Sequence, residues 1–234
     1  MIQIKLKDGS VIEREAGCAA LEIAASISAG LKRAALAAEV DGKVVDLMTP
    51  LEKDCSLAVL TWDAQEGKNT LRHTASHILA QAVKRLYPDA KLAIGPSIKD
   101  GFYYDIDSEH AFTPEDLETI EVEMRKIVKE NLKMERFELK REDAIAFMEN
   151  QKEPYKVELI QDLPEDAVIS FYRQGDFTDL CAGPHVPTTG LVKSLKLTSC
   201  TGAYWRGDSN RKMLQRIYGT AFLKKADLDE YLSR

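Results

Sequence analysis

The sequence predicts an α+β protein of two domains, a small one over residues 1–62 and a larger one over residues 63–234. Three observations lead to this prediction: strand-like alternation near the N-terminus, an amphipathic helical stripe after residue 70, and a polar, Gly-containing linker over residues 62–69 between them. A chain of 234 residues with 44% hydrophobic content can also bury a substantial core.

The first domain is predicted as a small sheet that holds one helix. Ile2, Ile4 and Leu6 alternate with polar residues, and Asp8-Gly9 predicts the turn of a hairpin. A helix over residues 19–27 with Gly30 as its stop follows, and then short strands over 36–40, 44–47 and 57–60. The resulting order β-β-α-β-β-β is grasp-like. It contains no cluster of His, Cys or paired acids, so we interpret it as a binding or regulatory module, or as a unit that merely packs on the rest.

The second domain is predicted to begin with a helix over residues 70–87, whose apolar residues form one stripe. His73 and His77 lie nearly opposite that stripe, so we expect them to face solvent or a cleft. Thr113-Pro114 predicts the start of a long helix. Further expected elements are strands over 91–94, 102–106 and 155–160 and a helix over 142–149.

Two short motifs nominate a functional site. His73 and His77 stand four residues apart on the predicted helix, which places both imidazoles on one face. Cys181 and His185 have the same spacing across a Gly-Pro turn, which can bring a thiol and an imidazole together. The chain holds four histidines and four cysteines in all, and these motifs take three of the histidines and one of the cysteines.

Such a group of three imidazoles and one thiol has several interpretations. It suits a zinc ion, structural if all four side chains bind and hydrolytic if one position stays open to water. It also suits metal-free chemistry, with histidine as base or orienter and cysteine or water as the attacking group. The plain alternative is surface histidines and a small buried cysteine.

Charge and cysteine usage narrow the class of protein. The net charge of −6 argues against nucleic-acid binding through overall charge. The four cysteines show neither a Cys-x2-Cys pair nor a dense framework, which favours reduced thiols in the cytoplasm. The N-terminus lacks the apolar core of a signal peptide, and no stretch is long and apolar enough to span a membrane.

A local basic segment indicates a polyanionic partner. Residues 193–216 contain six basic residues and one acidic residue. Tyr204, Trp205 and Arg206 lie there among glycines, a mixture that can hold phosphates and stack on an unpaired base. We therefore favour RNA as the partner, against the alternative of an ordinary surface loop.

Four motifs together resemble the threonyl-tRNA synthetase family. They are His73-Thr74-Ala75-Ser76-His77, Gly101-Phe102-Tyr103-Tyr104-Asp105, Asp179-Leu180-Cys181-Ala182-Gly183-Pro184-His185 and the segment from Gly202 to Asn210. Residues 1–62 resemble the ubiquitin-like TGS domain of that family, a β-grasp fold. Residues 63–234 resemble its α+β editing domain, which alanyl-tRNA synthetase shares in related form.

The resemblance implies hydrolysis of serine wrongly esterified to threonine tRNA. On this interpretation His73, His77 and His185 position and deprotonate a water molecule. Lys156 stabilises oxyanion charge or contacts the terminal adenosine, and Asp179 orients an imidazole or holds the serine ammonium group. Cys181 binds substrate, transfers a proton or ligates zinc. The residues expected to bind substrate are Gly95, Pro96, Tyr104, Tyr204, Trp205 and Arg206.

The resemblance also implies cofactors and partners. We expect metal-independent editing, with zinc at His73, His77, Cys181 and His185 as the alternative that the alanyl family suggests. The partner would be tRNA(Thr), above all its aminoacylated 3′ end. ATP and a further zinc would be needed only by an aminoacylation domain that these residues do not include, so we expect a fragment without threonine activation. A homodimer is expected for the full-length protein and a monomer for the fragment.

Two other classes of function stay open beside the editing hydrolase. The first is a zinc-stabilised RNA-binding module without catalysis, which predicts stoichiometric metal and unfolding on chelation. The second is a free-standing trans-editing or regulatory factor.

Overall fold

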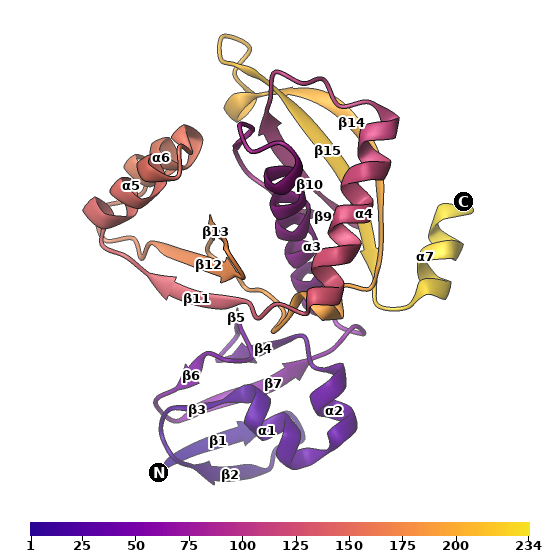
Figure 1. Cartoon of the computed structure of the whole chain (residues 1–234). Coiled ribbons are helices and arrows are strands. Elements are labelled where there is room, and N and C mark those ends of the chain that lie inside the picture. Colours follow the sequence, from indigo (N-terminus) through magenta and orange to yellow (C-terminus); the bar gives the residue numbers. More distant parts are fainter. The chain divides into compact units, whose positions relative to one another are not determined.

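A computed structural model describes all residues from 1 to 234 and shows two compact units (Figure 1). Residues 1–71 form the first unit together with residues 183–187, and residues 72–182 and 188–234 form the second. Mixed helix and strand in both units confirms the α+β class. None of the helices combines the length and the apolar composition that a membrane span requires.

The first unit is a five-stranded sheet of order β2-β1-β7-β4-β5, with a separate two-stranded pair β3-β6 and two helices. Strands β1 and β7 are parallel and central, while the other pairings are antiparallel. Its elements are β1 (Ile2–Leu6), β2 (Val11–Arg14), β3 (Cys18–Ala19), α1 (Ala20–Ile27), α2 (Ala29–Ala34), β4 (Ala37–Val40), β5 (Lys43–Val45), β6 (Pro50–Leu51) and β7 (Cys55–Leu60).

The core of the first unit lies between α1 and the sheet. Ile4 of β1, Ile23 of α1 and Leu57 of β7 are among its buried residues. The predicted hairpin, helix and strands are confirmed within a few residues, but Gly30 does not stop the helical region. Instead α1 ends at Ile27, and Ser28 caps a second short helix by accepting a hydrogen bond from the Leu31 N–H at 2.9 Å.

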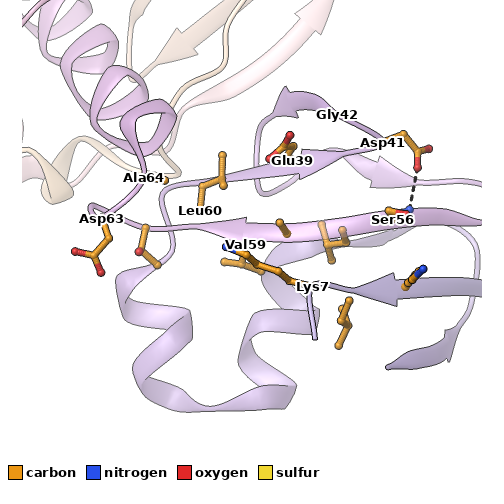
Figure 2. A pocket seen from close by; sticks show the side chains of 14 residues that line it. Lys7, Glu39, Asp41, Gly42, Ser56, Val59, Leu60, Asp63 and Ala64 are labelled. Carbon is orange, nitrogen blue, oxygen red and sulfur yellow. Dashed lines mark hydrogen bonds between the residues drawn. The ribbon is translucent and has the colours of Figure 1, made fainter. Parts of the chain in front are cut away.

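An open groove of about 670 Å³ lies along β1, β4 and β7 of the first unit (Figure 2). Its charged lining residues are of both signs, with Lys5 and Lys7 against Glu39, Asp41 and Asp63. It contains no histidine or cysteine, and the mixed charge does not select one class of ligand.

The second unit contains two antiparallel sheets, of order β14-β15-β10-β8 and β11-β12-β13. The short β9 also pairs with β10. Its elements, counted from the helix that leads into it, are α3 (Gln65–Leu86), β8 (Lys91–Leu92), β9 (Ser97–Ile98), β10 (Gly101–Asp107), α4 (Pro114–Glu130), β11 (Glu135–Glu138), α5 (Arg141–Asn150), α6 (Pro154–Gln161), β12 (Ser170–Gln174), β13 (Phe177–Leu180), the turn η1 (Thr189–Leu191), β14 (Ser194–Tyr204), the turn η2 (Trp205–Gly207), β15 (Met213–Phe222) and α7 (Lys225–Leu232).

Helices α3 and α4 lie side by side along the larger sheet (Figure 1). Arg85 of α3 pairs with Glu123 and Glu130 of α4, and Arg72 of α3 donates to the carbonyl of Ala221 in β15 at 3.0 Å. The start of α4 is as predicted, with Thr113 as cap and Pro114 in the first turn. A capping box with Asp116 completes it.

Three sequence predictions about helices were wrong. Residues 155–160 form helix α6 rather than a strand, because Pro154 stands in its first turn and Glu153 at its N-cap. The stretch 62–69 is not a loop throughout, since α3 already begins at Gln65. The side of helix α3 opposite its apolar stripe, which was expected to face solvent or a cleft, is closed to open solvent in the middle of the helix, because every residue from 74 to 83 is buried.

Candidate active site

Helix α3 supplies the two histidines of the first motif. The rings of His73 and His77 lie one turn apart, with centroids separated by 5.0 Å and planes inclined by 85°. His73 is half-buried, whereas His77 is only 3% exposed. Of the two, only His73 can be exposed to open solvent.

A buried polar network lies beside His77. Lys156 of α6 and Asp179 of β13 form an ion pair with Nζ and Oδ1 3.0 Å apart. Tyr104 of β10 connects them, because its hydroxyl accepts a hydrogen bond from Lys156 Nζ at 2.7 Å and donates one to Asp179 Oδ2 at 2.6 Å. All three side chains are buried, so each polar group is satisfied inside the protein.

The charges of this network follow from burial and from its partners. Burial alone would raise the pKa of Asp179, but Lys156 and His77 and the Tyr104 hydroxyl hold it below its ordinary value. Burial and the neighbouring Asp179 raise the pKa of Tyr104, which keeps its hydroxyl as a donor. Burial lowers the pKa of His77 to about 3, so its imidazole is neutral near pH 7. Asp179 Oδ2 lies 3.4 Å from His77 Nδ1 and can orient that ring.

The second motif brings a thiol and a third imidazole to the site. Cys181 Sγ lies 3.3 Å from His73 Nε2. The ligand atoms of His73, His77, Cys181 and His185 all lie within 4.8 Å of one another. The backbone N–H of His185 donates to the carboxylate of Asp46 at 2.7 Å.

This group could bind a metal ion, because three imidazoles and one thiolate are a donor set that zinc accepts. A tetrahedral zinc ion holds such atoms about 3.5 Å apart. Separations of up to 4.8 Å therefore require a small contraction of the side chains around an ion.

Gly95 packs directly on the Tyr104 ring. A Cβ atom at Gly95 would lie 2.1 Å from a carbon of that ring, so only glycine fits there. The Gly95 carbonyl accepts a hydrogen bond from the Ser76 hydroxyl of α3 at 2.6 Å. The Pro96 carbonyl accepts one from the Tyr103 N–H at 3.2 Å. The Gly95-Pro96 turn is thereby held between the histidine helix and the Tyr104 strand.

Of the other three residues expected to bind substrate, Trp205 and Arg206 contact α6 rather than the His/Cys group. Trp205 is 2% exposed, and its indole N–H donates to Glu158 of α6 at 2.7 Å. Arg206 pairs with Asp162 and Glu158. Tyr204 is 39% exposed and remains open to a partner.

Ion pairs neutralise most of the basic segment. Of its six basic residues only Lys193 lacks an acidic partner, whereas the other five pair with Glu121, Asp107, Glu158, Asp162 or Asp105. The positive charge that the sequence places between residues 193 and 216 is therefore largely balanced within the second unit.

Two acidic residues beside the site carry no sequence signal. Glu153 is 6% exposed and accepts a hydrogen bond from the Leu92 N–H at 3.0 Å. Glu158 accepts from Trp205 and Arg211. Neither belongs to a motif, and both look in the sequence like ordinary solvated charges.

Comparisons with known proteins identify two domain families in the chain. A family profile described as TGS domain matches residues 2–61, and one described as "Threonyl and Alanyl tRNA synthetase second additional domain" matches residues 169–218. The second match includes Asp179, Cys181 and His185.

Curated relatives match the whole chain. The threonine--tRNA ligase of Clostridium kluyveri is 64% identical over 99% of this chain and 36% of its own length. Those of Acetivibrio thermocellus and Clostridium botulinum are 65% and 66% identical, over 100% of this chain and 37% of theirs. The chain thus spans little more than a third of these relatives. It carries a TGS domain and a match to the threonyl and alanyl tRNA synthetase second additional domain, and over its whole length it is similar to the corresponding part of these threonine--tRNA ligases.

Proposed function

We propose that this chain is the editing part of a threonine--tRNA ligase and hydrolyses the ester of seryl-tRNA(Thr). The observation that carries the proposal is the juxtaposition of the His/Cys group with the buried Lys156–Asp179–Tyr104 network. Such a site combines basic, cationic and hydrogen-bonding groups within reach of one small ester. The cytoplasm, where tRNA is charged, is the proposed location.

The need for such an activity follows from the small chemical difference between serine and threonine. Serine lacks one methyl group of threonine, and one methyl is worth only about 1–3 kcal/mol in a binding pocket. A ligase that must reject serine more strictly needs a second site that removes it. An editing pocket can admit serine and exclude threonine by size.

The proposed roles follow the charges of the site. His73 is the better candidate to take a proton from water, because the depressed pKa of His77 makes its imidazole a weak base. Lys156 would stabilise the oxyanion, and Asp179 would orient the His77 ring or hold the serine ammonium group. Cys181, within 3.3 Å of His73, would transfer a proton or contact substrate, and His185 would help to position the water.

We also retain residues 1–62 and 63–234 as the proposed domain boundaries, and tRNA(Thr) as the proposed partner. The match of the TGS profile to residues 2–61 supports the first division. The exposed Tyr204 and the unpaired Lys193 remain the best candidates in the basic segment for contact with RNA.

The direct test is single-turnover deacylation of seryl-tRNA(Thr) and threonyl-tRNA(Thr) by the same preparation. We expect rapid loss of serine while threonine is spared. Equal cleavage of both esters would contradict a pocket that selects serine by size. If neither ester is cleaved, the proposed hydrolase activity is wrong.

The His/Cys group favours a second candidate, an RNA-binding module that zinc stabilises. Bound zinc would supply a Lewis-acid centre and fix these four side chains. Metal analysis and thermal unfolding with and without a chelator separate the candidates. The module predicts one zinc per chain and a large fall in melting temperature on chelation, whereas metal-independent editing predicts neither.

A further inference from the structure

Helix α6 presents two different faces within the second unit. Lys156 and Ile160 are buried on one face, where Lys156 reaches Tyr104 and Asp179. Tyr155, Glu158 and Leu159 lie about 130° away around the helix. Because both faces belong to one short helix, contacts made by this second face also fix the position of the Lys156 ammonium group.

The second face of α6 is covered by the segment that joins β14 to β15, residues 205–212, here called the hairpin tip. The Trp205 ring packs edge-on against Tyr155 with centroids 5.0 Å apart. Tyr155 and Leu159 pack against a small core of Ala93, Trp205 and Leu214. The hairpin tip is thus packed against α6.

Glu158 is the polar centre of this contact. Its carboxylate accepts the Trp205 indole N–H at 2.7 Å and an Arg211 N–H at 2.5 Å. The Arg206 Nε lies 3.4 Å from the same carboxylate. Hydrogen bonds that involve a charged group are among the stronger ones in proteins, and Glu158 accepts two of them.

The N-terminal end of α6 is tied separately. The Glu153 carboxylate accepts the Leu92 N–H at 3.0 Å and lies 3.4 Å from Lys84 Nζ. Tyr155 donates to Asp107 at 2.6 Å. The helix is therefore held at its start by β8 and α3 and along its outer face by the hairpin tip, with Lys156 between the two attachments.

We propose that Glu158 is a positioning residue for Lys156: through it the hairpin tip holds α6 so that the Lys156 ammonium stays against Tyr104 and Asp179. This inference rests on the proposed hydrolysis for its kinetic effect. Displacement of a reacting group by about 1 Å can cost on the order of 100-fold in rate. Arg206 and Arg211 then serve the site through α6 and not through RNA.

The Glu158→Gln variant separates these two roles of the arginines. Glutamine keeps an acceptor for Trp205 but loses the charge that binds Arg211, whereas Arg206 keeps its ion pair with Asp162. If Glu158 positions Lys156, the maximal single-turnover rate falls about tenfold while the enzyme concentration for half-maximal rate is unchanged. If Arg211 instead contacts RNA, its release in the Glu158→Gln variant lowers the enzyme concentration for half-maximal rate and leaves the maximal rate intact.

Three further variants sharpen the test. Arg211→Met removes a donor to the same carboxylate and is expected to lower the maximal rate like Glu158→Gln. Glu158→Ala removes the acceptor as well, so its rate should fall further. Gln161→Ala changes an exposed residue of the same helix and should leave the rate unchanged.

Hydrogen exchange of the α6 amides gives a readout that needs no catalysis. In Glu158→Gln these amides should exchange about tenfold faster, and in Gln161→Ala at the original rate. Unchanged exchange together with an unchanged maximal rate overturns the positioning role. If the unmodified protein hydrolyses no ester but α6 exchange still rises in Glu158→Gln, the proposed hydrolysis fails and the hold of the hairpin tip on α6 stands.

Discussion

Lys156 and Asp179 form an ion pair in which both side chains are almost completely removed from solvent, at 4% and 3% exposure. The hydroxyl of Tyr104 joins the two and satisfies a hydrogen-bonding position on each. Burying two charges is costly unless they are paired and hydrogen-bonded. The geometry therefore meets the condition under which a buried pair persists, and it makes each member depend on the other.

We predict that Lys156→Met destabilises the protein by about 3–5 kcal/mol, because it leaves the Asp179 carboxylate buried without its counter-charge. Urea unfolding measures this free energy. The matched control is Lys126→Met, since Lys126 is 65% exposed and its ion pair with Glu123 is solvated. The control should change stability by less than about 1 kcal/mol. A Lys156→Met loss no larger than that of the control would contradict the prediction.

We predict that His73→Ala lowers the rate of seryl-tRNA deacylation by about 10²–10⁴-fold, the usual contribution of a general base. The loss of stability should be small because His73 is only half-buried. His110 is the one histidine outside the two motifs and pairs with Asp116, so His110→Ala serves as the control. Its deacylation rate should equal that of the unmodified protein, and an equal loss in both variants would exclude a specific role for His73.

We predict that Gly95→Ala destabilises the protein by about 1–3 kcal/mol and slows deacylation, because the added Cβ must displace the Tyr104 ring. Thermal unfolding and the single-turnover rate measure both effects. Gly30→Ala is the matched control, since it lies in helix α2 with its nearest neighbouring atom 3.9 Å from the added Cβ. That variant should be neutral or more stable by up to about 1 kcal/mol. Full activity in Gly95→Ala would show that the ring position is not critical.

We predict a pH-dependent contribution of Asp116 to stability. Hydrogen bonds from the Thr113 N–H and from His110 lower the pKa of Asp116 to about 2, below its ordinary value of 3.8. As pH falls, the unfolded chain therefore takes up the proton first, so the contribution is complete above about pH 4 and is lost between about pH 4 and 2. The difference in unfolding free energy between the unmodified protein and Asp116→Asn should shrink across this window. A difference that stays constant from pH 5 to pH 2 would contradict the assignment.

Local sequence signals predicted much of the fold. The alternation of Ile2, Ile4 and Leu6 and the turn at Asp8-Gly9 indicated the first hairpin, and Thr113-Pro114 indicated the start of α4. These features depend on neighbours in the chain, so a single sequence contains them. The strand predicted over residues 155–160 was wrong. A short apolar run fits both the 3.6-residue period of a helix and the two-residue period of a strand, and only tertiary packing decides between them.

The sequence by itself determined which groups could form the site. The four-residue spacings of His73 with His77 and of Cys181 with His185 nominated the quartet, and the family resemblance added Lys156, Asp179 and Tyr104. Tertiary structure alone decided how these groups are paired. Burial depresses the pKa of His77, and Gly95 packs against the Tyr104 ring. Arg206 and Arg211 form ion pairs with Glu158 of α6. Each of these features depends on residues that are distant in the chain. Charge balance and solvent exclusion are properties of a three-dimensional neighbourhood, which no local pattern of residues records.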